Sequence, residues 1–211
     1  MYPLDLKLGA AKALNELLEP IRQDFKSSEL IKLTNEAYPP PKKKVVAEIS
    51  KLDIRVGKVL TVDVHPERDS LYVESIDLGE AEPRTIVSGL VKYISKADFC
   101  GKFVLVVCNM KPSKFAGVLS QGMVLAASNS DKTLVELLDP PAQVKVGDKV
   151  TFTGYDSLHD PGILNPKHKI FEKCAADFSI SSSRVAMFKE GEFQVNGSPV
   201  TVKSLAGGTI S

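Results

Sequence analysis

The sequence lacks the features that would place the chain in a membrane. Among its 211 residues, no apolar run approaches the roughly 20 residues that a spanning helix needs, and the N-terminus shows no signal-peptide pattern. We therefore expect a cytoplasmic protein with no membrane partner. Hydrophobic residues make up 43% and charged residues 25% of the sequence, which is typical of a soluble globular protein with one sizeable core.

Cysteine is scarce, and no constellation of residues suggests catalysis. Cys100, Cys108 and Cys174 lack metal-site spacing, and an odd number of scattered cysteines suits a reducing cytosol. Cys108 stands in an apolar run, so we expect it in the core. His65 has no cysteine nucleophile or serine elbow near it, and the sequence has no phosphate loop and no metal-ligand cluster. We predict no catalytic residue, no metal and no cofactor.

The most informative stretch runs from residue 103 to 127. Apolar runs at 103–108 and 124–127 have the composition of strands buried on both faces. Between them lies a polar, cationic loop that begins at Asn109 and carries Lys111 and Lys114. A rigid base beneath a polar loop is typical of a binding site, and a solvated hairpin connection is the alternative.

The pattern changes along the chain. Residues 1–38 have helical apolar spacing, with a break at Pro20. Residues 39–49 form a Pro/Lys linker, whose lysine triplet Lys42–Lys44 is a solvated run or contacts phosphate. From residue 50 to 155 the period is two, with one long strand bent at Gly57 and a short helix within 91–99. Residues 156–211 are less periodic but apolar enough to pack.

These patterns predict a mainly β protein. The expected architecture is a five-stranded OB-fold barrel over residues 50–155, a C-terminal extension over 156–211 packed on it, and a short N-terminal helical segment. A β-sandwich would need more strands. We also expect a monomer.

Five motifs support a family resemblance. They are Leu52-Asp53-Ile54-Arg55-Val56-Gly57-Lys58 followed by His65-Pro66, Asp69-Ser70-Leu71-Tyr72, Arg84-Thr85-Ile86-Val87-Ser88-Gly89-Leu90, Asn109-Met110-Lys111-Pro112 and Ser120-Gln121-Gly122-Met123. In this order and spacing they resemble the tRNA-binding domain family, whose members are similar to the endothelial monocyte-activating polypeptide II domain. The resemblance implies an OB-fold that binds tRNA.

The remaining parts of the chain resemble a eukaryotic relative of this family. Residues 156–211 are similar to its C-terminal extension, and residues 1–38 resemble the last helices of a tyrosyl-tRNA synthetase body. The implied partners are tRNA and a tyrosyl-tRNA synthetase catalytic body, in cis or in trans. Two features depart from this pattern, because the linker is short and no synthetase active site is present. The segment Lys111-Pro112-Ser113-Lys114 only superficially resembles a synthetase signature loop, since no catalytic domain surrounds it.

Eight residues are candidates for contact with tRNA. They are Arg55, Lys58, Ser88, Asn109, Lys111, Lys114, Ser120 and Met123. Lysine is a mobile point charge for phosphate and arginine a bidentate fork, whereas the Asn109 amide and the Ser120 hydroxyl can donate to a phosphate, a 2′-hydroxyl or a base edge. Two of these candidates have structural alternatives, because Arg55 can pair with Asp53, Glu74 or Asp77 and Met123 can belong to the core. Tyr72, Tyr93 and Phe115 are candidates for base stacking.

Three functions compete. The first is a tRNA-binding module that recognises shape and backbone with low sequence specificity and assists aminoacylation by a tyrosyl-tRNA synthetase. The second is a cytokine-like signalling fragment, because Arg55–Thr61 resembles a segment associated with that activity in the family. The third is a protein-interaction scaffold of a synthetase complex that uses the N-terminal helices.

Overall fold

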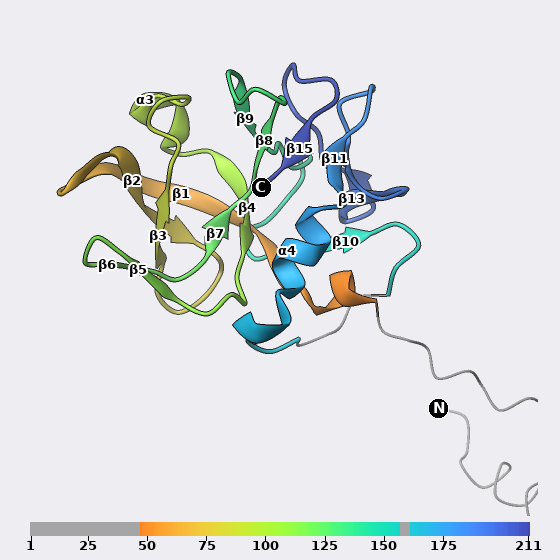
Figure 1. The fold of residues 1–211 in the computed structure, drawn as a ribbon, viewed down its shortest axis with the longest axis horizontal. Helices are drawn as coiled ribbons and strands as arrows, with labels where there is room; N and C mark the ends of the chain where they lie inside the picture. The colour runs from red at the N-terminus through yellow and green to blue at the C-terminus, as the bar shows by residue number, and fades with distance from the viewer. Residues whose placement is uncertain (1–46, 157–160) are drawn as a thin grey trace, which may run out of the picture. The chain divides into compact units, whose positions relative to one another are not determined.

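The computed structural model describes residues 47–156 and 161–211. The predicted helical segment 1–38 and nearly all of the linker 39–49 therefore lie outside the described residues. The described chain begins with a short 3₁₀ turn, Glu48–Lys51, and is mainly β with few helices, as predicted (Figure 1). Within the described residues, no helix is both long and apolar enough to cross a membrane.

The first sheet is antiparallel and contains the central motifs of the sequence. Its strand order is β3-β2-β1-β4-β7, with bounds β1 Ile54–His65, β2 Arg68–Asp77, β3 Arg84–Ser88, β4 Phe103–Val107 and β7 Met123–Val124. The helix predicted within 91–99 is α3, Lys96–Phe99, and the Ser95 hydroxyl caps it by accepting from the Asp98 amide. A hairpin of β5 Ser113–Phe115 and β6 Val118–Ser120 leaves the sheet after β4.

The first sheet curls so that its outer strands, β3 and β7, approach each other. Three hydrogen bonds join β3 to the residues just before β7. The Gln121 amide donates to the Thr85 carbonyl at 2.9 Å, the Thr85 amide donates to Gln121 Oε1 at 3.0 Å, and the Val87 amide donates to Ser120 Oγ at 3.0 Å. The Gln121 and Ser120 side chains thus accept hydrogen bonds from the β3 amides at the place where backbone pairing of the sheet ends.

The second sheet joins residues from both sides of position 156. Its order is β10-β13-β12-β11-β15-β8-β9, with β14 added to β13. The bounds are β8 Ala126–Ser128, β9 Val135–Leu137, β10 Val150–Phe152, β11 Phe178–Ile180, β12 Ala186–Phe188, β13 Gly191–Val195, β14 Ser198–Pro199 and β15 Thr209–Ile210. A 3₁₀ turn, Pro166–His168, and helix α4, Ile170–Ala175, precede β11. The two sheets lie side by side, and β7 leads into β8 between them (Figure 1).

Strand β4 is buried on both faces, as its continuous apolar run predicts. Val104 and Val106 belong to the core inside the curled sheet, whereas Leu105 and Val107 belong to the larger core shared with the second sheet. Cys108, 6% exposed, continues the first of these faces. The run has no polar face because it has no solvent face.

Strand β1 is the long strand that the sequence predicts, but its pairing changes beyond the glycine. The register with β2 shifts between Val59 and Thr61, not at Gly57 itself. Gly57 meets a different requirement: a Cβ there would lie 2.6 Å from Ile76 Cγ2 and 2.9 Å from Leu78 Cδ2. Close packing against β2 therefore requires glycine at this position.

We predict that Gly57→Ala destabilises the fold by roughly 1–3 kcal/mol, the usual cost of overpacking a core. Gly89→Ala is the matched control, since a Cβ at Gly89 would meet nothing within 4 Å. Urea unfolding of both variants measures the difference. Equal stability of the two variants would contradict this account of Gly57.

Candidate functional site

The β5–β6 hairpin projects from the body of the first sheet (Figure 1). Its two turn residues, Ala116 and Gly117, have φ of 42° and 89°, as a two-residue turn matching the twist of antiparallel strands requires. All three residues of β5 are exposed. The hairpin therefore presents the side chains of β5 to solvent, whereas Ser120 at the end of β6 is buried.

A buried histidine ties this hairpin to the turn between β1 and β2. His65 is 1% exposed, and its Nδ1 accepts from the Glu67 amide at 3.1 Å. The other ring nitrogen, Nε2, therefore carries the proton and donates to the Phe115 carbonyl at 3.0 Å. The sequence marks His65 only as part of a motif; its contact with residue 115, fifty positions away, is visible only in the fold.

All three lysines among the predicted site residues are exposed. Lys111 and Lys114 lie on or just before β5, and Lys58 lies on β1 with its ammonium 5.8 Å from the centre of the Phe103 ring. Lys114 also lies beside Arg68 of β2 around a shallow depression. The structure thus places Lys111, Lys114 and Arg68 around one projecting element.

Other predicted residues are engaged inside the protein. Arg55 binds Asp53 through Nε at 2.9 Å and Nη2 at 2.5 Å, and its Nη1 lies 3.5 Å from Glu80. This ion pair raises the pKa of Arg55 above its usual value. Of the partners considered from the sequence, Asp53 is the one observed, while Glu74 accepts a hydrogen bond from Ser88 instead.

The Asn109 side-chain amide joins the start of the loop to two distant segments, around residues 51–53 and at residue 162. Its Nδ2 donates to the carbonyls of Lys51 and Gly162, each at 2.8 Å, and its Oδ1 accepts from the Asp53 amide at 3.0 Å. Asn109 is only 6% exposed. Both amide hydrogens are thus engaged within the chain at the base of the loop.

Ser120 and Arg84 form hydrogen bonds that hold the opposite side of the loop. Ser120 Oγ donates to the Gly122 carbonyl at 3.0 Å while accepting from the Val87 amide. Arg84 Nη1 donates to the carbonyls of Cys108 and Gln121, at 2.5 and 2.9 Å, and its remaining donors bind Glu80. Arg84 was not among the predicted site residues. Its four hydrogen bonds could not be predicted, because an arginine at the start of a strand has no distinctive sequence pattern.

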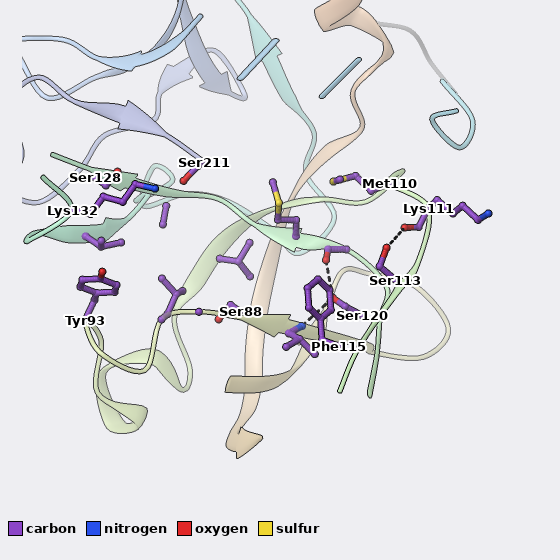
Figure 2. A pocket seen from close by; sticks show the side chains of 18 residues that line it. Ser88, Tyr93, Met110, Lys111, Ser113, Phe115, Ser120, Ser128, Lys132 and Ser211 are labelled. Atoms are coloured by element: carbon purple, nitrogen blue, oxygen red, sulfur yellow. Dashed lines mark hydrogen bonds between the residues drawn. The ribbon is translucent and has the colours of Figure 1, made fainter. Parts of the chain in front are cut away.

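A groove of about 480 Å³ lies between β3, β7, the hairpin and the start of the second sheet. Its apolar lining includes Val87, Leu90, Val124, Ala126 and Val135, and its rim includes Tyr93, Phe115, Met110 and Met123. Four predicted residues, Ser88, Lys111, Ser120 and Met123, come together along this groove, and Figure 2 shows Ser88 midway between Tyr93 and Phe115. Lys114, Lys58, Arg55 and Asn109 do not line it.

A buried carboxyl lies behind the groove. Glu74 is 0% exposed, and its Oε1 accepts from the Ser88 hydroxyl. Among the described residues, Glu74 Oε2 has no hydrogen-bond partner. Burial raises the pKa of Glu74 to about 8, against the opposing effect of the Ser88 hydrogen bond. Within the part of the chain that the structure describes, no cluster of three or more His, Cys, Asp or Glu side chains suits a metal ion.

Comparisons with known proteins agree with the motifs. Residues 54–149 match the family described as "Putative tRNA binding domain". The whole chain aligns over 224 positions with cytoplasmic tyrosine–tRNA ligase of Gallus gallus at 49% identity, covering 42% of that protein. It is also 41% identical to aminoacyl tRNA synthase complex-interacting multifunctional protein 1 of Cricetulus griseus, over 85% of this chain and 49% of that one.

A solved structure supports the same assignment. The C-terminal domain of Plasmodium vivax p43 superposes with a TM-score of 0.71 at 34% identity, over 77% of this chain and 98% of that domain. The chain therefore belongs to the tRNA-binding domain family, and the resemblance stated from the motifs is confirmed. The chain spans less than half the length of the tyrosine–tRNA ligases that it matches, and it corresponds to their C-terminal part.

We predict that Asn109→Ala lowers the free energy of unfolding by on the order of 3 kcal/mol. Each buried group left without a partner costs about 1–3 kcal/mol, and this variant strands the Asp53 amide and two carbonyls. Lys111→Ala, two positions along and exposed, should stay within about ±0.5 kcal/mol. Urea unfolding measures both. Parental stability of Asn109→Ala would show that the amide is not a structural clamp.

A second prediction concerns pH. Because the pKa of Glu74 is raised to about 8, the folded state holds a proton that the unfolded state releases above its ordinary carboxyl pKa. The contribution of Glu74 is therefore fully present below about pH 4.5 and is lost as pH rises towards 8, at up to about 1.4 kcal/mol per pH unit. Glu74→Gln cannot titrate, so its stability relative to the parent should increase across this window. Parallel stability curves for parent and variant between pH 5 and 8 would contradict the assignment.

Proposed function

We propose that this chain is a tRNA-binding module that recognises the shape and backbone of tRNA with low sequence specificity. The observation that carries the proposal is the projecting β5–β6 hairpin, which holds Lys111 and Lys114 in solvent on a base fixed by Asn109 and His65. Exposed ammonium groups on a fixed element suit phosphate contacts, which supply most of the sequence-independent affinity for nucleic acids. The family to which the chain belongs supports tRNA as the ligand.

The module assists a tyrosyl-tRNA synthetase catalytic body, in cis or in trans, by raising the local concentration of tRNA. It is an appended domain and not an enzyme on its own. We further propose that it works in the cytoplasm as a monomer and that its curled first sheet is an OB-type barrel. In this barrel β1, β2, β3, β4 and β7 are the strands and the Ser120 and Gln121 side chains close the gap to β3.

The predicted residues divide into two groups under this proposal. Lys58, Lys111 and Lys114 contact phosphate, and Ser88 and Met123 contact the RNA from the groove. Arg55, Asn109 and Ser120 act indirectly, because their polar groups are engaged in holding the first sheet and the loop. Such supporting contacts fix the geometry of a binding element without touching the ligand.

The signalling alternative has no comparable support. Arg55–Thr61, the cytokine-like segment, lies within β1, which is paired with β2 on one side and β4 on the other. Val56, Gly57 and Val59 are buried. Within the sheet only Lys58, Leu60 and Thr61 of this segment are exposed, so a receptor could not reach the whole segment in the folded chain.

We predict that replacing both Lys111 and Lys114 by alanine weakens tRNA binding about equally for unrelated tRNAs. The plot of log affinity against log salt should flatten by about 1 to 2 units, because fewer counterions are released. Folding stability should change by no more than about 0.5 kcal/mol for each exposed lysine. A filter-binding titration across a salt series measures both affinity and slope.

The matched control is the double variant Lys145→Ala and Lys203→Ala, which removes the same charge from exposed positions outside the hairpin and the groove. It should bind tRNA nearly as the parent does. If instead the hairpin variant binds like the parent at every salt concentration, the hairpin is not the site. The cationic segments at 42–44 and 167–173 would then be tested in the same way.

A further inference from the structure

The groove beside the hairpin has a property that backbone recognition does not require, namely an apolar floor that is open to solvent. Val87, Leu90 and Val124 are at most 8% exposed as residues, yet they line a space of about 480 Å³. A volume of this size is within the range of pockets that hold small organic groups. Phosphate contacts alone would not need such a surface.

Two of the three aromatic stacking candidates lie at this groove. Tyr93 is half-buried and Phe115 is 44% exposed, and both line the space. The third, Tyr72, is buried and its hydroxyl donates to the Ile94 carbonyl at 3.1 Å. Met110 and Met123 add polarizable surface that adapts to a flat ring.

Polar side chains lie both between the two aromatic residues and at the two ends of the groove. Ser88 lies between them with its hydroxyl oriented by Glu74. Lys132 lies at the Tyr93 end of the groove, and Lys111 at the Phe115 end extends away from it (Figure 2). Among the described residues lining the groove there is no carboxylate side chain. The charge is thus suited to an anionic chain that enters at one end and leaves at the other.

We infer that this groove takes an unpaired nucleotide of the bound RNA, with the base on the apolar floor against Tyr93 or Phe115 and the flanking phosphates towards Lys132 and Lys111. The inference rests on the proposed function and deepens it from backbone contact to base stacking. Stacking is tolerant of sequence, because every base has a π-face. A base within a duplex cannot enter, since both of its faces are already stacked.

The test uses a single-stranded RNA hexanucleotide with 2-aminopurine at an inner position, and the same strand annealed to its complement. The single strand should bind with a change in 2-aminopurine fluorescence, and the duplex should give no such change. Tyr93→Ala and Phe115→Ala should each weaken single-strand binding by about 5- to 150-fold if the residue stacks on the base. At least one of them must do so.

Gly89→Phe provides an independent obstruction of the groove, because a Cβ at this lining position meets no atom within 4 Å. It should lower hexanucleotide affinity at least 10-fold and abolish the fluorescence change, while the salt slope for tRNA stays parental. Ala142→Phe adds the same ring at an exposed position away from the groove and should have no effect. Urea unfolding of each variant confirms that it is folded.

The outcomes separate this inference from the proposed function. If the groove variants bind the hexanucleotide like the parent while the Lys111 and Lys114 double variant loses tRNA affinity, the groove is not a nucleotide site and the proposed function stands. Equal fluorescence changes for single strand and duplex would also overturn the groove inference. If the parent binds the hexanucleotide through the groove but does not bind tRNA, the proposed function fails and the groove inference survives.

Discussion

Burial of β4 on both faces is the constraint on which the rest of this structure depends. One set of alternating side chains fills the curled first sheet, and the other set fills the core shared with the second sheet. The same alternation continues through Val124 and Leu125 on the far side of the loop. Both ends of the hairpin segment are therefore held by two cores at once, so neither sheet can move without disturbing the base of the loop.

The polar clamps act in addition to this apolar base. Asn109 joins the end of β4 to residues 51, 53 and 162, while Arg84 joins it to Gln121 and Glu80. Each clamp binds backbone groups of residues that lie outside the named strands, and such groups are costly to bury without a partner. The loop is consequently fixed at its root and exposed at its tip, which suits an element that must meet a large ligand.

Local patterns were sufficient to predict the long strands of the first sheet, but not the short strands of residues 178–210 or the roles of the polar residues. The period-two segments and the apolar run at 103–108 correctly predicted β1 to β4. The bend predicted at Gly57 is not where the register shifts, and this glycine is instead required by close packing against Ile76 and Leu78. Side-chain identity could not show that the Asn109 and Ser120 hydrogen bonds are satisfied within the chain, because every partner except the Gly122 carbonyl is 33 to 58 positions away. The sequence also could not reveal the groove, since it assembles residues 87 to 135 with the chain's last residue.

Arg55 and Arg84 are paired within the chain, whereas the exposed cations around the hairpin are mainly lysines. This difference explains why such a site would recognise the RNA backbone and not the base sequence. Arginine forks give bidentate base recognition, but Arg55 and Arg84 are bound to Asp53 and Glu80. The exposed cations around the hairpin are mainly lysines, which are mobile point charges that follow phosphates without selecting a base edge. With a net charge of only +1 for the whole chain, the proposed attraction to RNA would have to come from this local concentration of ammonium groups. An apolar, sequence-tolerant groove beside them fits the same low selectivity, because stacking and phosphate contact are both indifferent to base identity.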